Sequence, residues 1–155
     1  LMYKGYTTVV DVDLKGYFDS IPHDQLMGYV EEYVADGRVL GLLGEFMSAS
    51  VMEGLTEWTP ESGCPQGAVI SPLLSNIYLN GLDHMMEQAG FHLIRYADDF
   101  VIMCRTDDDA VTALALVEEY TRAHGLTIHP EKTKVVDASK AALALHLCDW
   151  MTMSS

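Results

Sequence analysis

The chain has 155 residues, with 23 acidic and nine basic side chains that give a formal net charge of −14, and 49% of it is hydrophobic. This length fits one domain, and the apolar content excludes a disordered or low-complexity chain. No apolar run reaches the roughly 18 residues that a membrane-spanning helix needs. Lys and Arg are absent from Val39 to Ile94, so binding to a polyanion would require metal ions or a basic surface from elsewhere.

The cysteines, Cys64, Cys104 and Cys148, are odd in number and far apart. This pattern fits neither a disulfide framework nor a paired-cysteine metal site. The six histidines show no zinc-ligand spacing with a cysteine, so we assign them no chemistry. We therefore expect reduced thiols in a cytoplasmic protein.

The first predicted element is a strand rich in Val and Thr over residues 6–14. One face is predicted to carry Tyr6, Thr8, Val10, Val12 and Leu14. The other face carries Thr7, Val9, Asp11 and Asp13. Because residues two apart in a strand share a face at roughly 6.5 to 7 Å, the two aspartates are expected to point the same way.

Two helices and a hairpin are predicted next. Pro22 can open a helix that Asp36 and Gly37 close, and a second short helix follows over residues 39–47. Residues 51–63 have no helical period and contain turn-forming residues, which favours an irregular hairpin.

The second half of the chain is predicted to be helix, hairpin, helix. Ser71 is expected to cap a helix that begins with Pro72 and stops at Gly90. Residues 92–96 and 100–104 are β-prone and enclose a tip that holds two acids. The last helix is expected to begin at Thr106 with Asp107, Asp108 and Asp109 as capping residues, to bury Val111, Leu114, Val117 and Tyr120, and to end before Gly125. One α+β domain accounts for this order of elements.

Two pairs of carboxylates carry the predicted chemistry: Asp11 with Asp13 on the first strand, and Asp98 with Asp99 at the hairpin tip. Acid pairs at the ends of buried strands are costly unless cations neutralise them, and hard divalent ions prefer oxygen ligands. Each pair alone is a common surface or turn feature. Together they suggest a shared two-metal site for phosphoryl or nucleotidyl transfer.

Four segments share a pattern with a known family: VDVDLKGYFD at 10–19, GCPQGAVISPLLSNIYL at 63–79, RYADD at 95–99 and HPEKTK at 129–134. In this order, they resemble successive motifs of group II intron-type reverse transcriptases. Order and spacing both match over about Val9–Val136, which is most of the chain. The long second segment is the most specific of the four.

The resemblance implies an α+β polymerase palm, a small antiparallel sheet backed by helices. It assigns Asp13, Asp98 and Asp99 as catalytic metal ligands for two Mg²⁺ ions, with Mn²⁺ as a substitute. We expect Asp98 to be the closer ligand and Asp99 a weaker one, since neighbours in a strand face opposite sides. The role of Asp11 stays open. Lys132 matches a catalytic lysine placed near the leaving pyrophosphate, where a cation stabilises developing charge.

The resemblance also implies how a dNTP binds. Phe18 matches the aromatic residue that packs under the incoming sugar and favours a deoxyribose, although a simple core role is the alternative. Pro65, Gln66 and Gly67 match the loop that touches the nucleotide, where glycine lets the backbone approach and Gln offers a donor and an acceptor.

The implied reaction is RNA-directed DNA synthesis, with an RNA template, a DNA primer and dNTPs as partners. We expect residues 1–155 to form a single palm domain with an atypical tail at 138–155. The fingers and thumb that complete the palm are expected to belong to a longer polypeptide. Apolar surface left bare by those parts would favour self-association. The alternative is a catalytically silent remnant that binds divalent metal or a partner chain. A nucleotide cyclase is less favoured, because the loop at Pro65–Gly67 has no role in one.

Overall fold

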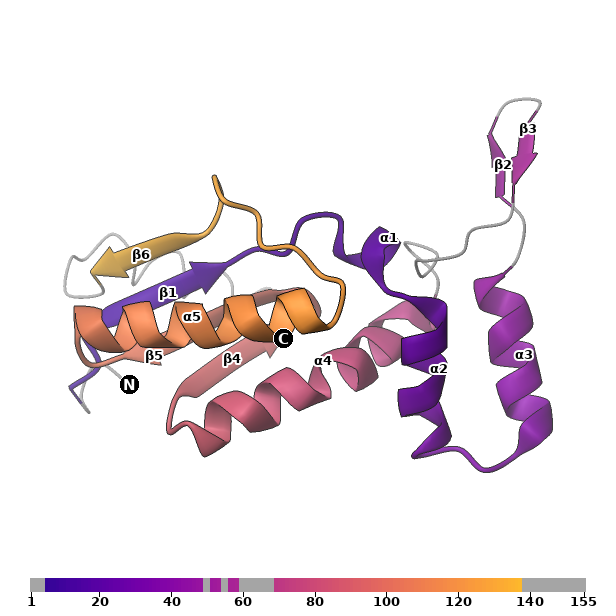
Figure 1. Cartoon of the computed structure of the whole chain (residues 1–155), viewed down its shortest axis with the longest axis horizontal. Helices are drawn as coiled ribbons and strands as arrows, with labels where there is room; N and C mark the ends of the chain where they lie inside the picture. The colour runs from indigo at the N-terminus through magenta and orange to yellow at the C-terminus, as the bar shows by residue number, and fades with distance from the viewer. Residues whose placement is uncertain (1–4, 49–50, 54–55, 59–68, 138–155) are drawn as a thin grey trace.

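Four antiparallel strands form the central sheet, in the order β4-β5-β1-β6. They are β1 (Thr8–Val12), β4 (His92–Tyr96), β5 (Asp99–Cys104) and β6 (Lys134–Asp137). The computed structural model describes residues 5–48, 51–53, 56–58 and 69–137. Figure 1 shows β1 and β5 in the middle of the sheet. The first motif therefore begins on a central strand, and the third motif ends at the first residue of the strand beside it.

The alternation predicted for β1 is confirmed within the strand. Val10 and Val12 are fully buried in the main core, whereas Asp11 is exposed. The face predicted for Tyr6 is wrong, because Tyr6 packs with Val9 and Met103 in a separate small cluster. The strand begins at Thr8, so strict alternation does not extend back to residue 6.

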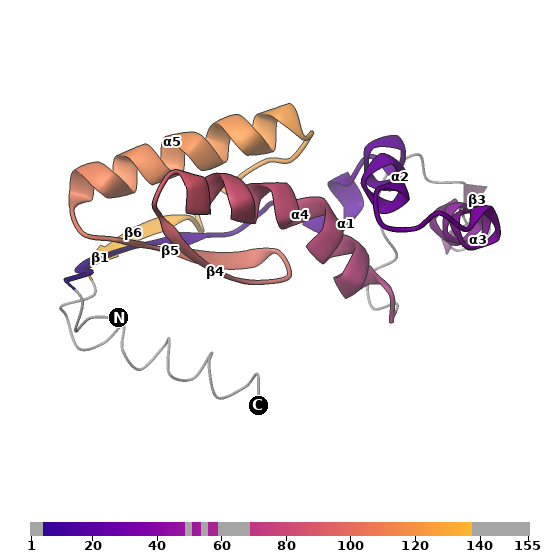
Figure 2. The same ribbon diagram turned by 90° about the horizontal axis from the view of Figure 1, so that it is seen from below.

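Two long helices, α4 (Ser71–Gln88) and α5 (Asp107–Ala123), cover one face of the sheet, as Figure 2 shows. The α4 helix buries a stripe at the spacing of one helical turn: Leu74, Tyr78, Leu82 and Met86. This stripe belongs to the main core, and α4 contacts β4, α5 and α2 (His23–Glu31).

The prediction that Ser71 caps α4 is wrong by one residue. Ser71 is the first helical residue and is buried, and Ile70 holds the cap position without a side-chain hydrogen bond. Backbone bonds from Leu73 and Leu74 to the Ile70 carbonyl, at 3.0 and 3.1 Å, close the first turn. Gly90 follows the helix with φ 82°, as expected of a C-terminal stop.

Thr106 caps α5, as predicted, and with Asp109 it forms a capping box. The Thr106 hydroxyl accepts from the Asp109 amide, and the Asp109 carboxylate accepts from the Thr106 amide. The predicted buried stripe is wrong at Val111, which is 69% exposed. Ala110 and Ala113 are buried in its place, because the small side chains let the helix lie close to the sheet.

Three helices extend the molecule away from the sheet: α1 (Tyr17–Ser20), α2 (His23–Glu31) and α3 (Gly37–Met47). In Figure 1, α2 lies beside α4 and α3 lies on the outer side of α2. The prediction that Asp36 and Gly37 close the helix opened by Pro22, which is α2, is wrong. The α2 helix ends at Glu31, and Asp36 caps α3 by accepting from the Arg38 amide at 2.8 Å.

Part of the predicted hairpin is described as β2 (Val51–Glu53) paired with β3 (Thr56–Trp58). Pro65, Gln66 and Gly67 lie outside the described residues, and so does the segment 138–155. Among the helices of the described part, none has the length and apolar content to cross a membrane.

Candidate active site

Two aspartates from distant motifs meet where β1 ends and β5 begins. Asp13 directly follows β1, and Asp98 lies in the turn between β4 and β5. Val12 pairs with Phe100 across the antiparallel ladder, so the end of β1 and the start of β5 share one edge of the sheet. The register of the strands therefore brings the first and third motifs together.

Asp13 and Asp98 both line a cavity of about 210 Å³. Its other lining residues are Leu14, Lys15, Gly16, Tyr17, Phe18, Asp19, His129 and Lys132. Gly16 adopts φ 56°, a left-handed conformation that suits glycine, and this turn swings the chain from β1 into α1 beside the cavity.

The turn carboxylates lie in an environment that disfavours negative charge. Burial raises the pKa of the Asp98 carboxyl, and the nearby carboxylates of Asp99 and Asp13 raise it further. Burial also raises the pKa of Asp99, with Asp13 adding to the rise and Lys132 opposing it. The three acids therefore lie close enough to repel one another, which a bound cation would relieve.

Lys132 reaches the same place from the far end of the chain. Its ammonium Nζ donates to Asp13 Oδ2 at 3.3 Å. Two backbone bonds bring this segment alongside the end of β1: the His129 amide donates to the Asp13 carbonyl at 2.8 Å, and the Lys15 amide donates to the Thr127 carbonyl at 2.8 Å. The fourth motif thus supplies a cation to the acid cluster.

The donor set suits a hard divalent ion. Asp13 and Asp98 offer carboxylate oxygens to one cavity, and Mg²⁺ is commonly held by one or two protein carboxylates with water and substrate phosphate completing its shell. Within the described residues, no group of three or more His, Cys, Asp or Glu side chains is arranged to hold a metal ion. Asp99 is not among the described residues that line the cavity.

The remaining predicted site residues fall into three groups. Phe18 lines the cavity, packs against the main core and contacts Tyr17 edge-to-face at 5.2 Å between ring centroids. Asp11 is exposed and is not among the described lining residues. The loop at Pro65–Gly67 lies outside the described residues.

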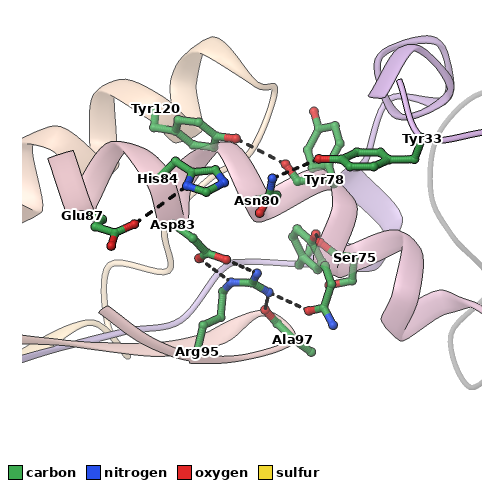
Figure 3. Close-up of polar contacts among 12 residues, drawn as sticks. Tyr33, Ser75, Tyr78, Asn80, Asp83, His84, Glu87, Arg95, Ala97 and Tyr120 are labelled. Atoms are coloured by element: carbon green, nitrogen blue, oxygen red, sulfur yellow. Dashed lines mark hydrogen bonds and ion pairs between the residues drawn. The ribbon is translucent and has the colours of Figure 1, made fainter. Parts of the chain in front are cut away.

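Sequence reasoning overlooked two residues at this site. His129 lines the cavity, although the histidines carried no assignment; its place three residues before Lys132 was the available signal. Arg95 lies just before the acid turn, and its guanidinium contacts both that turn and α4 (Figure 3). Its position in the RYADD segment was visible, but its contacts depend on the tertiary fold.

An antiparallel sheet with helices on one face and carboxylates gathered at a strand end is the α+β arrangement of a polymerase palm. The profile of the family described as reverse transcriptase (RNA-dependent DNA polymerase) matches residues 2–146. The chain belongs to this family. The resemblance drawn from the four motifs and the predicted α+β fold class are both confirmed.

The relatives of this chain include a group II intron-encoded protein and a retron reverse transcriptase. The chain is 37% identical over 86 residues to the group II intron-encoded protein LtrA of Lactococcus lactis subsp. cremoris, which is 56% of this chain and 14% of that protein. It is 42% identical over 81 residues to protein YkfC of Escherichia coli, covering 52% and 21%. The retron Mx162 reverse transcriptase of Myxococcus xanthus matches 87% of this chain and 32% of that protein at 28% identity. The chain thus spans a third or less of each.

Solved telomerase structures share the fold. Telomerase from Candida albicans aligns with 86% of this chain and 27% of that chain, with a TM-score of 0.70 and 16% identity. Telomerase from Candida tropicalis aligns with 88% and 30%, at the same TM-score and 13% identity. At these sequence identities, the structural similarity establishes the fold alone. A function has to be argued from the residues of the site.

Proposed function

We propose that this chain is the catalytic palm of an RNA-directed DNA polymerase that adds dNTPs to a primer 3′-hydroxyl. One observation carries the proposal. Asp13 and Asp98 belong to two different motifs and are 85 positions apart in the sequence, yet both line a single cavity at the sheet edge. Membership of the reverse transcriptase family supports the reaction class.

Asp13 and Asp98 would hold two Mg²⁺ ions, or Mn²⁺ in their place, and Asp99 would act from farther away. Magnesium bound there would supply the positive charge that activates the primer hydroxyl and stabilises the phosphate oxygens. The reaction joins the primer 3′-oxygen to the α-phosphorus, breaks the bond to the β-phosphate and releases pyrophosphate. Lys132, whose ammonium already faces the acid cluster, would neutralise charge on that leaving group.

The substrate and template side of the proposal uses the rest of the cavity. Phe18 would pack under the incoming sugar and exclude a 2′-hydroxyl, and Pro65, Gln66 and Gly67 would contact the nucleotide. RNA template and DNA primer would bind mainly through fingers and thumb supplied by a longer polypeptide, because this chain carries a net charge of −14.

Calorimetry with Mn²⁺ tests the metal site on the chain itself. We expect binding that is lost in Asp13→Asn and in Asp98→Asn, since each change removes an anionic ligand. Asp109→Asn is the matched control, because Asp109 caps α5 beyond the other end of β5. Unchanged affinity in both site variants would overturn the ligand assignment.

Primer extension tests the reaction. With the fingers and thumb of a group II intron relative fused to the chain, we expect dTMP addition on poly(rA)/oligo(dT) that requires Asp13 and Asp98. Absence of synthesis in a folded fusion that binds Mn²⁺ would favour the rival function, a catalytically silent domain that binds divalent metal.

A further inference from the structure

The guanidinium of Arg95 joins β4 to α4 and to the turn that bears Asp98 (Figure 3). Its Nε donates to Asp83 Oδ1 at 2.8 Å, and Nη2 donates to Asp83 Oδ2. Its Nη1 donates both to Asn76 Oδ1 at 2.9 Å and to the Ala97 carbonyl at 3.0 Å. The Arg95 side chain is 8% exposed, whereas the side chain of its partner Asp83 is 35% exposed, so the guanidinium is buried and its partners reach the surface.

The backbone that Arg95 holds is in an unfavourable conformation. Ala97 has φ 55° and is the one residue other than glycine with positive φ in the described part of the chain. A side chain with a Cβ disfavours this left-handed region, so such a turn persists where its surroundings hold it. The Arg95 contact to the Ala97 carbonyl is such a restraint, and the next residue is Asp98.

The other end of the restraint is rigid. Asn76 and Asp83 lie seven residues apart on α4, and therefore on one side of it, two turns apart. The buried stripe of α4, which includes Tyr78 and Leu82, packs the helix against the core. A simple ion pair would be complete with Asp83 alone, whereas Arg95 also reaches Asn76 and the turn carbonyl.

We propose that Arg95 is a positioning residue: with Asp83 and Asn76 it ties the strained Ala97 turn to α4 and thereby holds the Asp98 carboxylate at the cavity. This inference rests on the proposed function, because it assumes that Asp98 binds the metal. An arginine suits the task because its planar fork donates in several directions at once, which a lysine ammonium on a flexible stem does not reproduce.

The test measures Mn²⁺ affinity of the chain by calorimetry and electron paramagnetic resonance. Arg95→Lys keeps a positive charge beside Asp83 but loses the fork, and we expect affinity to fall about 10-fold or more, as for other residues that orient metal ligands. Arg95→Met should lose at least as much. Arg38→Met is the matched control, since Arg38 forms an exposed pair with Asp36 far from the turn, and it should leave affinity unchanged.

Rescue separates positioning from a general loss of structure. Glycine adopts positive φ without a Cβ penalty, so Ala97→Gly in the Arg95→Lys background should restore most of the lost affinity. An unchanged affinity in a folded Arg95→Lys chain would overturn the proposal, and so would a loss that Ala97→Gly does not repair. Two other outcomes would contradict the proposed function instead. One is that the unaltered chain binds no Mn²⁺, and the other is that Asp98→Asn binds Mn²⁺ with the same affinity as the unaltered chain.

Discussion

Aspartates gather at both ends of β5, and the two groups meet different environments. Asp98 and Asp99 stand where β5 begins. Asp107, Asp108 and Asp109 stand just beyond its end, in the first turn of α5. Both groups are runs of acids beside a buried strand. The sequence predicts that the group after Thr106 caps a helix and that the pair at the hairpin tip binds metal.

The negative charge of the group at α5 is stabilised by hydrogen bonds and by the helix on which the group lies. The Asp109 carboxylate accepts from the amides of Arg105 and Thr106 at 3.2 Å each, and Asp107 accepts from the Thr8 hydroxyl at 3.0 Å. The N-terminus of a helix also favours negative charge through its dipole. These acids stabilise the structure in which they are found.

The negative charge of the group at the turn lies in a less favourable environment. Burial and repulsion by neighbouring carboxylates, including Asp13, raise the pKa values of Asp98 and Asp99, and the opposing charge of Lys132 is shared with Asp13. Unbalanced acids in a cavity are a feature of sites whose counter-charge comes from a ligand. The contrast teaches that the surroundings of an acid, more than its sequence pattern, separate structural from functional carboxylates.

The largest effect expected is on catalysis. In the fusion that carries fingers and thumb, Asp98→Asn should reduce primer extension by about 10³-fold or more, because metal stabilisation of the transition state amounts to several kcal/mol. Asp109→Asn should leave the rate nearly unchanged. Steady-state dTTP incorporation on poly(rA)/oligo(dT) measures both.

Thermal denaturation without divalent ions completes this comparison. Asp98→Asn should not lower the melting temperature, since it removes a charge that the folded state disfavours. Asp109→Asn should lower it, since it weakens a cap. Equal effects of the two changes on rate and stability would erase the distinction between the two ends of β5.

Divalent ions should stabilise the chain through the turn acids. At a Mg²⁺ concentration ten times the dissociation constant, linkage gives about 1.4 kcal/mol of added stability. Asp13→Asn and Asp98→Asn should abolish this gain, whereas Asp109→Asn should keep it. Chemical denaturation with and without Mg²⁺ measures the difference, and a gain that survives in both site variants would place the ion elsewhere.

Much of this architecture could be predicted from the sequence. The hairpin of β4 and β5, the helix cap at Thr106 and the strand through Val10 and Val12 follow from local periodicity and capping chemistry. The errors at Asp36, Ser71 and Val111 have a common origin, because capping and turn residues suit either end of a helix and tertiary packing decides which face is buried.

The site was less accessible to sequence reasoning. Acid patterns and the family resemblance pointed to Asp13 and Asp98, but their meeting depends on the register in which Val12 faces Phe100. The contacts of Arg95 with Asp83 and the left-handed backbone of Ala97 depend on how α4 lies beneath β4. Long-range packing of that kind leaves no periodic trace in the chain.

Removing the α5 cap should cost less than the metal contributes. Thr106→Ala deletes the hydroxyl that accepts from the Asp109 amide at 3.1 Å, and the loss of such a cap costs about 1 kcal/mol. Denaturant titration should show this loss equally with and without Mg²⁺. Thr106→Ser, which keeps a hydroxyl, is the control and should retain most of the stability; dependence of the loss on Mg²⁺ would link the two ends of β5.

The smallest expected effect is a pH dependence of stability in EDTA. Because the folded state raises the pKa values of Asp98 and Asp99 above the ordinary 3.8, it binds more protons than the unfolded chain between that value and the raised ones. Stability from these two groups should therefore fall as pH rises through this window and level off above it. Both groups are partly exposed, so solvent screening keeps the change small.

Two variants test the assignment of this pH dependence. Combining Asp98→Asn with Asp99→Asn should remove the pH-dependent part of the stability. Lys132→Met should extend the pH window to higher pH, since Lys132 lowers both pKa values. Denaturation curves that rise with pH across the window, or that are unaltered by the double change, would contradict the assigned environment of the turn.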